Sequence, residues 1–152
     1  QAMRFGSAVH AVFECIEWWN DKAKAKVECL RKSETEAVEA VEKCLQAKDI
    51  AAFFQNDGDG AAVWRERAFE LVMEGEICSG VFDRVVVHDG HAEVIDFKTD
   101  RVKSETDITE AVERHREQME WYRRVLTQLT VLPEARITCR LLFTHPHRVV
   151  TL

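Results

Sequence analysis

The amino-acid sequence predicts an α/β domain with one mixed sheet. Along the chain, several helices precede the strands, and a long helix separates the first three strands from the last two. Three observations carry this prediction. Helical periodicity dominates residues 5–54, runs rich in β-branched side chains dominate 62–98, and a long amphipathic stretch separates these runs from two further strand-like segments. We expect a single domain over residues 1–152, with a mainly helical part at 1–60 and an α/β core at 61–152.

The first sixty residues favour helices. Apolar residues from Phe5 onward recur at helical spacing, and the charged segment after them continues in the same way. Ser33 followed by Glu36 is a capping-box pattern, and Asp49 is expected to cap a short helix. The Asn-Asp-Gly-Asp-Gly run at 56–60 lacks the later ligands of an EF-hand and is interpreted as a turn. The expected helices are 5–19, 20–31, 34–47 and 49–54.

A β-hairpin is the strongest local signal in the sheet region. A first strand is expected at 62–75, followed by two β-branched runs, Val81–Val87 and Ala92–Phe97, around His88-Asp89-Gly90-His91. An Asp-Gly pair between such runs favours a type I′ turn. If His88 pairs with His91, Asp83 falls directly opposite Asp96, and Lys98 returns to the same face because side chains alternate along a strand.

Two aspartates that face each other across a hairpin need an explanation, since like charges opposite one another destabilise the pairing. A divalent cation between Asp83 and Asp96 is the simplest candidate. The alternative is an ordinary surface ion pair of Asp96 with Lys98, beside a second exposed carboxylate.

After Lys98 the pattern changes to a long helix and two more strands. Asp107, with Glu110 three residues later, is expected to cap a helix that runs to about residue 129, before Pro133 stops it. Strands are expected at 136–144 and 149–152. On the helix, Gln118 and Tyr122 are i and i+4 neighbours whose polar ends reach the same place. The alternative is a helix that merely packs on the sheet, with Tyr122 half buried.

The composition excludes several classes of protein. With 46% apolar and 32% charged residues, the chain has the make-up of a globular domain, and no apolar run reaches the length of a membrane span. Its five cysteines form no CxxC pair, which argues against a disulfide framework, a zinc ribbon or an iron–sulfur cluster and favours a reducing, cytoplasmic location. The net charge of −6 argues against a protein that binds nucleic acid with its whole surface, although a partner could supply basic surface.

Four motifs occur in a fixed order along the chain. They are His10 in GSAVHAVFE, Asp83 in GVFDRV, Asp96-Phe97-Lys98 in VIDFKTD, and Gln118-x-x-x-Tyr122 in QMEWY. In this order and spacing the chain resembles the RecB/AddA-like branch of the PD-(D/E)xK nuclease superfamily, over most of its length. The resemblance implies a restriction-endonuclease-like fold, a mixed sheet flanked by helices with an N-terminal helical segment. The segment Glu66-Arg67-Ala68-Phe69 looks like the family's preceding strand without its frequent proline, and Glu66 is assigned a structural role.

The resemblance also implies a set of site residues. The metal ligands would be His10, Asp83, Asp96 and the backbone carbonyl of Phe97, holding Mg²⁺ or alternatively Mn²⁺, because oxygen-rich sites with one imidazole suit these ions. Asp83 and Asp96 would thus be catalytic together with Lys98, which would orient water and stabilise charge on the phosphate. Gln118 and Tyr122 would position DNA or hydrogen-bond to the acidic residues and Lys98. The other histidines are expected at turns or on the surface, namely His88, His91, His115, His145 and His147.

By the same resemblance the function would be that of a Mg²⁺-dependent deoxyribonuclease of the exonuclease V type. It would degrade single-stranded DNA ends delivered by a helicase domain or subunit during recombinational double-strand-break repair, without an iron–sulfur cluster or a membrane. The chain has no GxxxxGK(S/T) motif, so it is not the motor itself, and we expect it to be the C-terminal part of a longer helicase–nuclease. Alternatives are a catalytically inactive nuclease-fold module that binds DNA or a partner subunit, and a stand-alone nuclease that acts on RNA or flap ends.

Overall fold

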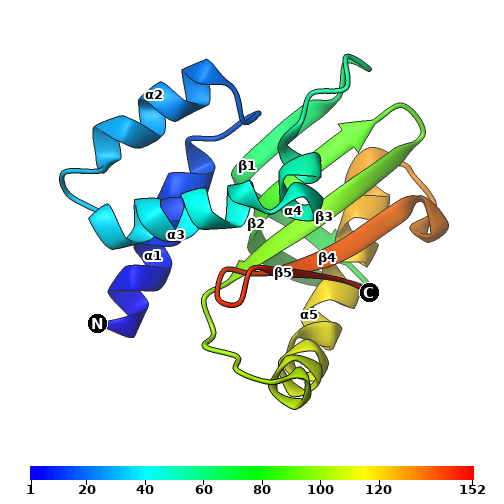
Figure 1. Ribbon diagram of the computed structural model, residues 1–152. Helices are drawn as coiled ribbons and strands as arrows, with labels where there is room; N and C mark the ends of the chain where they lie inside the picture. The colour runs from blue at the N-terminus through cyan, green and yellow to red at the C-terminus, as the bar shows by residue number, and fades with distance from the viewer.

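A computed structural model describes residues 1–152, with helices on both faces of a five-stranded sheet (Figure 1). The helices are α1 (Ala2–Glu14), α2 (Asp21–Leu30), α3 (Thr35–Gln46), α4 (Lys48–Ala51) and α5 (Glu105–Thr130), with single 3-10 turns η1 (Ala52–Phe54) and η2 (Glu134–Arg136). The strands are β1 (Ala62–Met73), β2 (Glu76–His88), β3 (His91–Lys98), β4 (Ile137–Phe143) and β5 (Arg148–Thr151). No helix here combines the length and the apolar character that a bilayer crossing requires.

The strands lie in the order β1-β2-β3-β4-β5, and the sheet is mixed as predicted. Only β3 and β4 are parallel, because α5 carries the chain from the end of β3 back to the start of β4. The other neighbours are antiparallel. The register predicted for the hairpin is confirmed: His88 pairs with His91, and the ladder continues to the pair Arg84 and Ile95.

Each face of the sheet carries its own apolar core. The helices α1 to α4 pack on the face that presents Ile95 and Phe97, whereas α5 packs on the face that presents Val94. Alternation along β3 therefore serves two cores at once, as expected for a strand covered on both sides. On the first face the ring of Phe97 stacks on that of Phe13 at 3.9 Å between centroids, which fixes α1 against β3.

Helix α1 ends at Glu14, five residues before the predicted end. The residues that follow it present their carbonyls to two arginines of the sheet. Arg65 donates to the Glu14 carbonyl at 2.8 Å, and Arg84 donates to the carbonyls of Ile16 and Glu17 at 2.7 and 2.6 Å. Arg65 and Arg84 are paired across β1 and β2, so their like charges both lie at the negative end of the helix dipole. The chain then turns away instead of continuing the helix.

Three predicted helix caps are wrong. The Ser33 hydroxyl donates to the Leu30 carbonyl and caps nothing, because α3 begins after residue 34 without a side-chain cap. Asp49 lies inside α4 rather than before it. Asp107 is the third residue of α5, and the capping residue is Ser104: the Ser104 hydroxyl accepts from the Asp107 amide, and the Asp107 carboxylate accepts from the Ser104 amide. Helix α5 therefore starts with a complete capping box.

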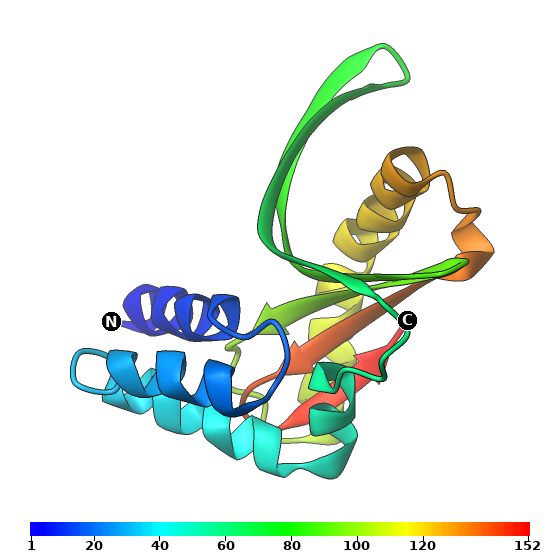
Figure 2. The ribbon, with the colours of Figure 1, turned by 90° about the horizontal axis from the view of Figure 1, so that it is seen from above.

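The hairpin of β1 and β2 extends beyond the rest of the sheet. Figure 2 shows it arching away from β3 on the side opposite to the N-terminal helices, with a free loop at its end. Its last paired residues are Met73 and Glu76. We call this part of the hairpin, residues 67–82, the arm. The point where the arm leaves the sheet is the place at which the predicted site residues meet.

Candidate functional site

Three acidic residues lie in one row across neighbouring strands where the arm leaves the sheet. The pairs Arg65–Arg84 and Arg67–Phe82 bracket a position at which Glu66 is opposite Asp83. The register of the next hairpin places Asp83 opposite Asp96. Directly opposite residues have Cβ atoms about 5 Å apart. Neither Glu66 and Asp83 nor Asp83 and Asp96 form a regular ladder pair, so the pairing of the strands is interrupted at the row itself.

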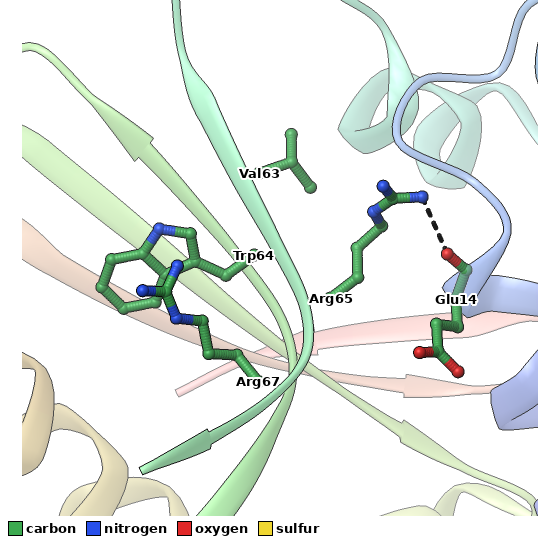
Figure 3. A pocket seen from close by; sticks show the side chains of 5 residues that line it. All are labelled: Glu14, Val63, Trp64, Arg65 and Arg67. Atoms are coloured by element: carbon green, nitrogen blue, oxygen red, sulfur yellow. Dashed lines mark hydrogen bonds between the residues drawn. The ribbon is translucent and has the colours of Figure 1, made fainter.

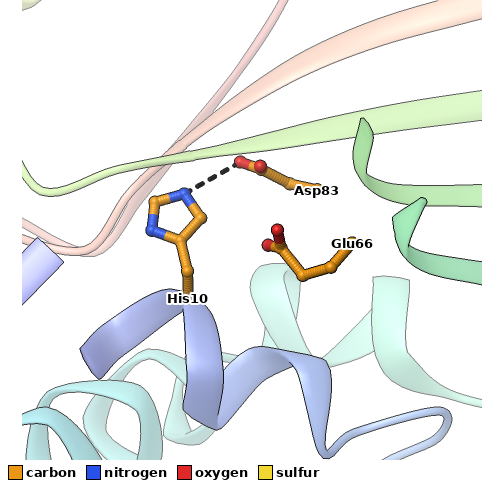
Figure 4. A group of neighbouring side chains, drawn as sticks. All are labelled: His10, Glu66 and Asp83. Atoms are coloured by element: carbon orange, nitrogen blue, oxygen red, sulfur yellow. Dashed lines mark hydrogen bonds and ion pairs between the residues drawn. The ribbon is translucent and has the colours of Figure 1, made fainter. Parts of the chain in front are cut away.

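Helix α1 brings His10 to the middle of this row. The Nε2 atom of His10 lies 3.0 Å from Oδ2 of Asp83, and its Nδ1 atom lies 2.8 Å from the Gly6 carbonyl one turn earlier (Figure 4). Asp83 Oδ2 also accepts the backbone amide of Phe97 at 2.8 Å. The hydrogen bond with Asp83 raises the pKa of His10 to about 9, although partial burial of the ring acts in the opposite direction. The imidazole is thus fixed at both nitrogens.

Glu66 completes a convergent group that the sequence analysis did not assign. Ligand atoms of His10, Glu66 and Asp83 all lie within 4.8 Å of one another, and Figure 4 shows the Glu66 carboxylate directed toward the other two. The Oε1 atom of Glu66 is buried without a hydrogen-bond partner. Burial is the main cause that raises the pKa of Glu66 to about 7, and the charge of Asp83 is the second. The backbone of Glu66 has φ of 44°, which is uncommon for a residue with a side chain.

A signal for Glu66 was present in the sequence. The Glu74-Gly75 turn between β1 and β2 fixes the register of the arm, as the Asp-Gly turn does for the next hairpin. Applied to the first turn, the same argument places Glu66 opposite Asp83. The positive φ of Glu66 and the burial of its carboxylate leave no such signal in the sequence, because they depend on the tertiary structure around the residue.

Asp96 and Lys98 lie at the end of β3, beside the convergent group. Lys98 Nζ is 2.7 Å from Oδ2 of Asp96 and 3.3 Å from Oε1 of Gln118. Asp96 is only 4% exposed. Burial, followed by the charge of Asp83, raises the pKa of Asp96, and Lys98 opposes this effect. The carboxylate of Asp96 is close to Asp83 but is not among the atoms that converge within 4.8 Å.

Gln118 and Tyr122 meet as their helical spacing predicted. The Gln118 amide nitrogen donates to the Tyr122 hydroxyl at 3.2 Å, and that hydroxyl donates to the Val81 carbonyl at 3.0 Å. Burial is the main cause that raises the pKa of Tyr122, and the charges of Asp96 and Asp83 add to it. Tyr122 is therefore a neutral hydrogen-bonding group that ties α5 to the arm, two residues before Asp83. Gln118 connects it to Lys98.

The remaining histidines lie outside the convergent group. His115 is one turn before Gln118, and its Nε2 atom lies 3.3 Å from Oδ2 of Asp100. Burial, followed by the charge of Lys98, lowers the pKa of His115. His88 and His91 stack on each other at the hairpin turn, with centroids 4.3 Å apart.

The donor set fits a divalent cation. One imidazole nitrogen and two carboxylates already point to a common centre, and one of the carboxylate oxygens has no partner within the protein. Burial is the largest cause of the raised pKa values of Glu66 and Asp96, and the charge of Asp83 adds to it, so a bound cation would stabilise the ionised form of both carboxyls. Oxygen-rich ligands with a single imidazole are suited to Mg²⁺ or Mn²⁺.

Fold and site together define the class of domain. A mixed sheet covered by helices on both faces, with an Asp-x-Lys pair at the end of the strand where the sheet opens, is the restriction-endonuclease-like arrangement. The chain belongs to the PD-(D/E)XK nuclease superfamily, whose sequence profile matches residues 1–150.

Several curated relatives are named as subunits of an ATP-dependent helicase/nuclease. The protein of Limosilactobacillus fermentum is 27% identical over 175 residues, which cover 97% of this chain and 13% of the relative. The protein of Streptococcus pyogenes serotype M12 is 26% identical over 147 residues, 88% of this chain and 12% of the relative. That of Enterococcus faecalis is 27% identical over 154 residues, 85% and 12% respectively. The chain therefore spans only a small part of the length of these relatives.

Proposed function

We propose that this domain is a metal-dependent DNA exonuclease that hydrolyses phosphodiester bonds of single-stranded ends. It would work with a helicase, as the name of its relatives combines both activities, in recombinational double-strand-break repair in the cytoplasm. One observation carries the proposal. The acidic row of Glu66, Asp83 and Asp96 lies beside His10 and Lys98 at the opening of the sheet.

His10, Glu66 and Asp83 are the side chains that would hold the cation, with Asp96 and the Phe97 carbonyl as the further ligands that the family resemblance implies. A bound divalent ion would supply neutralisation of the phosphate charge and a lowered pKa of water. The protein's contribution is the fixed geometry. The hydrogen bond of His10 to the Gly6 carbonyl orients the imidazole, and the Phe97 amide holds the Asp83 carboxylate.

Lys98 is assigned an electrostatic role. Its ammonium group is held by Asp96 on one side and by the amide oxygen of Gln118 on the other, so it has a defined position next to the acidic row. A protonated amine cannot accept the proton of water, but it stabilises the negative charge that develops on the phosphate in the transition state. Gln118 and Tyr122 act as positioning residues, since they connect Lys98 to the backbone of the arm.

The test is the activity of Asp96→Asn on linear single-stranded DNA. We expect Mg²⁺- or Mn²⁺-dependent degradation by the unaltered protein, no degradation in EDTA, and a loss of about a hundredfold or more in the variant, comparable to the removal of one essential transition-state contact. Asp59→Asn is the matched control, because Asp59 is an acidic residue of the 56–60 loop that contacts His88 far from the row. It should keep full activity.

The second candidate is a nuclease-fold module that only binds DNA or a partner subunit. It is favoured if the unaltered protein, saturated with Mg²⁺ or Mn²⁺, shows no cleavage beyond that of Asp96→Asn on any substrate. The presence of every expected site residue argues for the enzyme.

A further inference from the structure

A cavity of about 320 Å³ lies on the outer edge of β1, beside the acidic row. Five residues line it: Glu14, Val63, Trp64, Arg65 and Arg67 (Figure 3). Its size is at the lower end of the range of small-molecule pockets, about 300–1,000 Å³. β1 is the edge strand of the sheet, so no further strand covers this side. The cavity is therefore open to a ligand that approaches the row from outside.

The two arginines of the cavity have no carboxylate partner. Arg67 is exposed and forms no hydrogen bond or ion pair, and Arg65 donates only to the Glu14 carbonyl. Of the eleven arginines outside the cavity, six are ion-paired with an aspartate or glutamate: Arg31, Arg114, Arg116, Arg124, Arg140 and Arg148. The cavity thus concentrates positive charge and free donors, which suit a phosphate group.

An aromatic surface lies next to this charge. The guanidinium of Arg67 lies over the ring of Trp64, 4.7 Å from its centroid, and Figure 3 shows the two groups stacked in the cavity wall. Arg65 extends to the other side, toward α1. Stacked aromatic and guanidinium planes hold unpaired bases in proteins that bind single strands. A base within a duplex is already stacked between its neighbours and cannot use this surface.

Glu66 links the cavity to the row. It lies in sequence between Arg65 and Arg67, yet its carboxylate joins His10 and Asp83 on the inner side. Regular alternation along a strand places residue 66 on the face opposite to residues 65 and 67. A nucleic-acid strand bound in the cavity therefore lies next to the acidic row, because Arg65 and Arg67 are each one residue away from Glu66 along β1.

We propose that the cavity binds one nucleotide of a single-stranded nucleic acid, next to the nucleotide that is cut. Arg65 and Arg67 contact its phosphate, and its base stacks on the plane formed by Trp64 and Arg67. The identity of the ligand rests on the proposed function. Glu14 is the acidic residue of the lining, and its negative charge lowers the affinity of the cavity for an anionic ligand.

The test measures binding without cleavage. A fluorescein-labelled oligothymidylate is titrated with protein in EDTA, and its anisotropy is recorded at several salt concentrations. Arg67→Gln should bind at least fivefold more weakly, since one stacked base contributes about 1–3 kcal/mol. Loss of one phosphate contact should also reduce the slope of log K against log salt by about 0.7. Arg67→Lys keeps the charge, so it should keep the salt slope and lose only part of the affinity.

Two further variants, a duplex ligand and an unfolding measurement serve as controls. Arg116→Gln removes the same charge from a partly exposed, ion-paired arginine on α5 and should bind like the unaltered protein. Glu14→Gln removes the opposing charge and should bind more tightly. A duplex of the same length should show no difference between Arg67→Gln and Arg116→Gln. Thermal unfolding of each variant, followed by circular dichroism, establishes that all are folded.

The proposal is overturned if Arg67→Gln binds the single strand as well as Arg116→Gln does, or if it weakens duplex binding equally. A nuclease assay of the same proteins separates this outcome from failure of the proposed function. If the unaltered protein cuts DNA and Arg67→Gln has an unchanged KM, only the cavity assignment is wrong. If no protein cuts DNA but Arg67→Gln still weakens single-strand binding, the cavity assignment stands and the nuclease proposal is wrong.

Discussion

Substitution of Arg84 by methionine tests how the sheet holds the histidine helix. Arg84 is 1% exposed, and its guanidinium lies 4.3 Å from the ring centroid of Phe54 while it donates to the carbonyls of Ile16 and Glu17. Burial lowers the pKa of this arginine to about 9, which shows that the protein bears a desolvation cost to keep it there. The benefit is the closure of the end of α1, the helix that carries His10.

The magnitude follows from the two hydrogen bonds. Arg84→Met leaves two carbonyls without their donor at a cost of about 1–3 kcal/mol each, and the lost desolvation cost offsets part of this, so we expect a net loss of about 2–4 kcal/mol of unfolding free energy. With a urea m-value of about 2 kcal/mol/M, the unfolding midpoint falls by about 1–2 M. The variant still folds, because domains are typically stable by about 5–15 kcal/mol.

Urea unfolding followed by circular dichroism measures this change, and Mn²⁺ titration of the folded variant measures its effect on the site. Since α1 is held less firmly, Mn²⁺ affinity should fall about tenfold, the lower end of the effect of groups that orient metal ligands. Arg116→Met, which removes a partly exposed arginine on α5, should change neither quantity. A midpoint for Arg84→Met that equals that of Arg116→Met would refute the argument that Arg84 closes the end of α1.

Two further predictions concern other elements. Ser104→Ala should lower the unfolding free energy by about 1 kcal/mol because it removes the cap of α5, whereas Ser33→Ala should have no measurable effect; thermal unfolding of both variants decides whether the capping box contributes. Burial lowers the pKa of His88, but its hydrogen bonds to Asp59 and Glu93 outweigh burial and raise it above 6.5. The folded state therefore favours the protonated ring of His88. The stability advantage of the unaltered protein over His88→Gln should be complete below pH 6.5 and should disappear as the pH rises through the folded pKa. Equal differences in urea midpoint between the two proteins at pH 5.5 and at pH 9 would contradict this.

The parts of the site that local rules determine could be predicted from the sequence. The Asp-Gly turn fixes the hairpin register, so the neighbourhood of Asp83 and Asp96 follows from counting residues. Helical spacing brings Gln118 to Tyr122 for the same reason. Both arguments need only short-range geometry, and the structure agrees with both.

The parts that depend on long-range packing could not be predicted. Arg84 bonds to carbonyls 67 and 68 residues away, and no local pattern indicates which carbonyls an arginine will reach. The early end of α1 follows from these contacts, because the apolar periodicity of the sequence continues past Glu14. The helix caps failed for a different reason. Ser33 and Asp49 match the residue preferences of caps, but α3 and α4 are held by packing of their apolar faces and need no cap.

The opening of the sheet and the assembly of the site have the same structural origin. In a regular ladder, the amide of Phe97 would bond to a backbone carbonyl of a neighbouring strand, but here it donates to the carboxylate of Asp83. The side chain thus replaces a backbone partner, and the strand pair separates without leaving the amide unsatisfied. The separation in turn makes room for His10 from α1 and for the unusual backbone of Glu66. A row of acidic side chains would be unfavourable in an intact sheet, so these residues explain both why the sheet opens at this point and why a cation would be bound there.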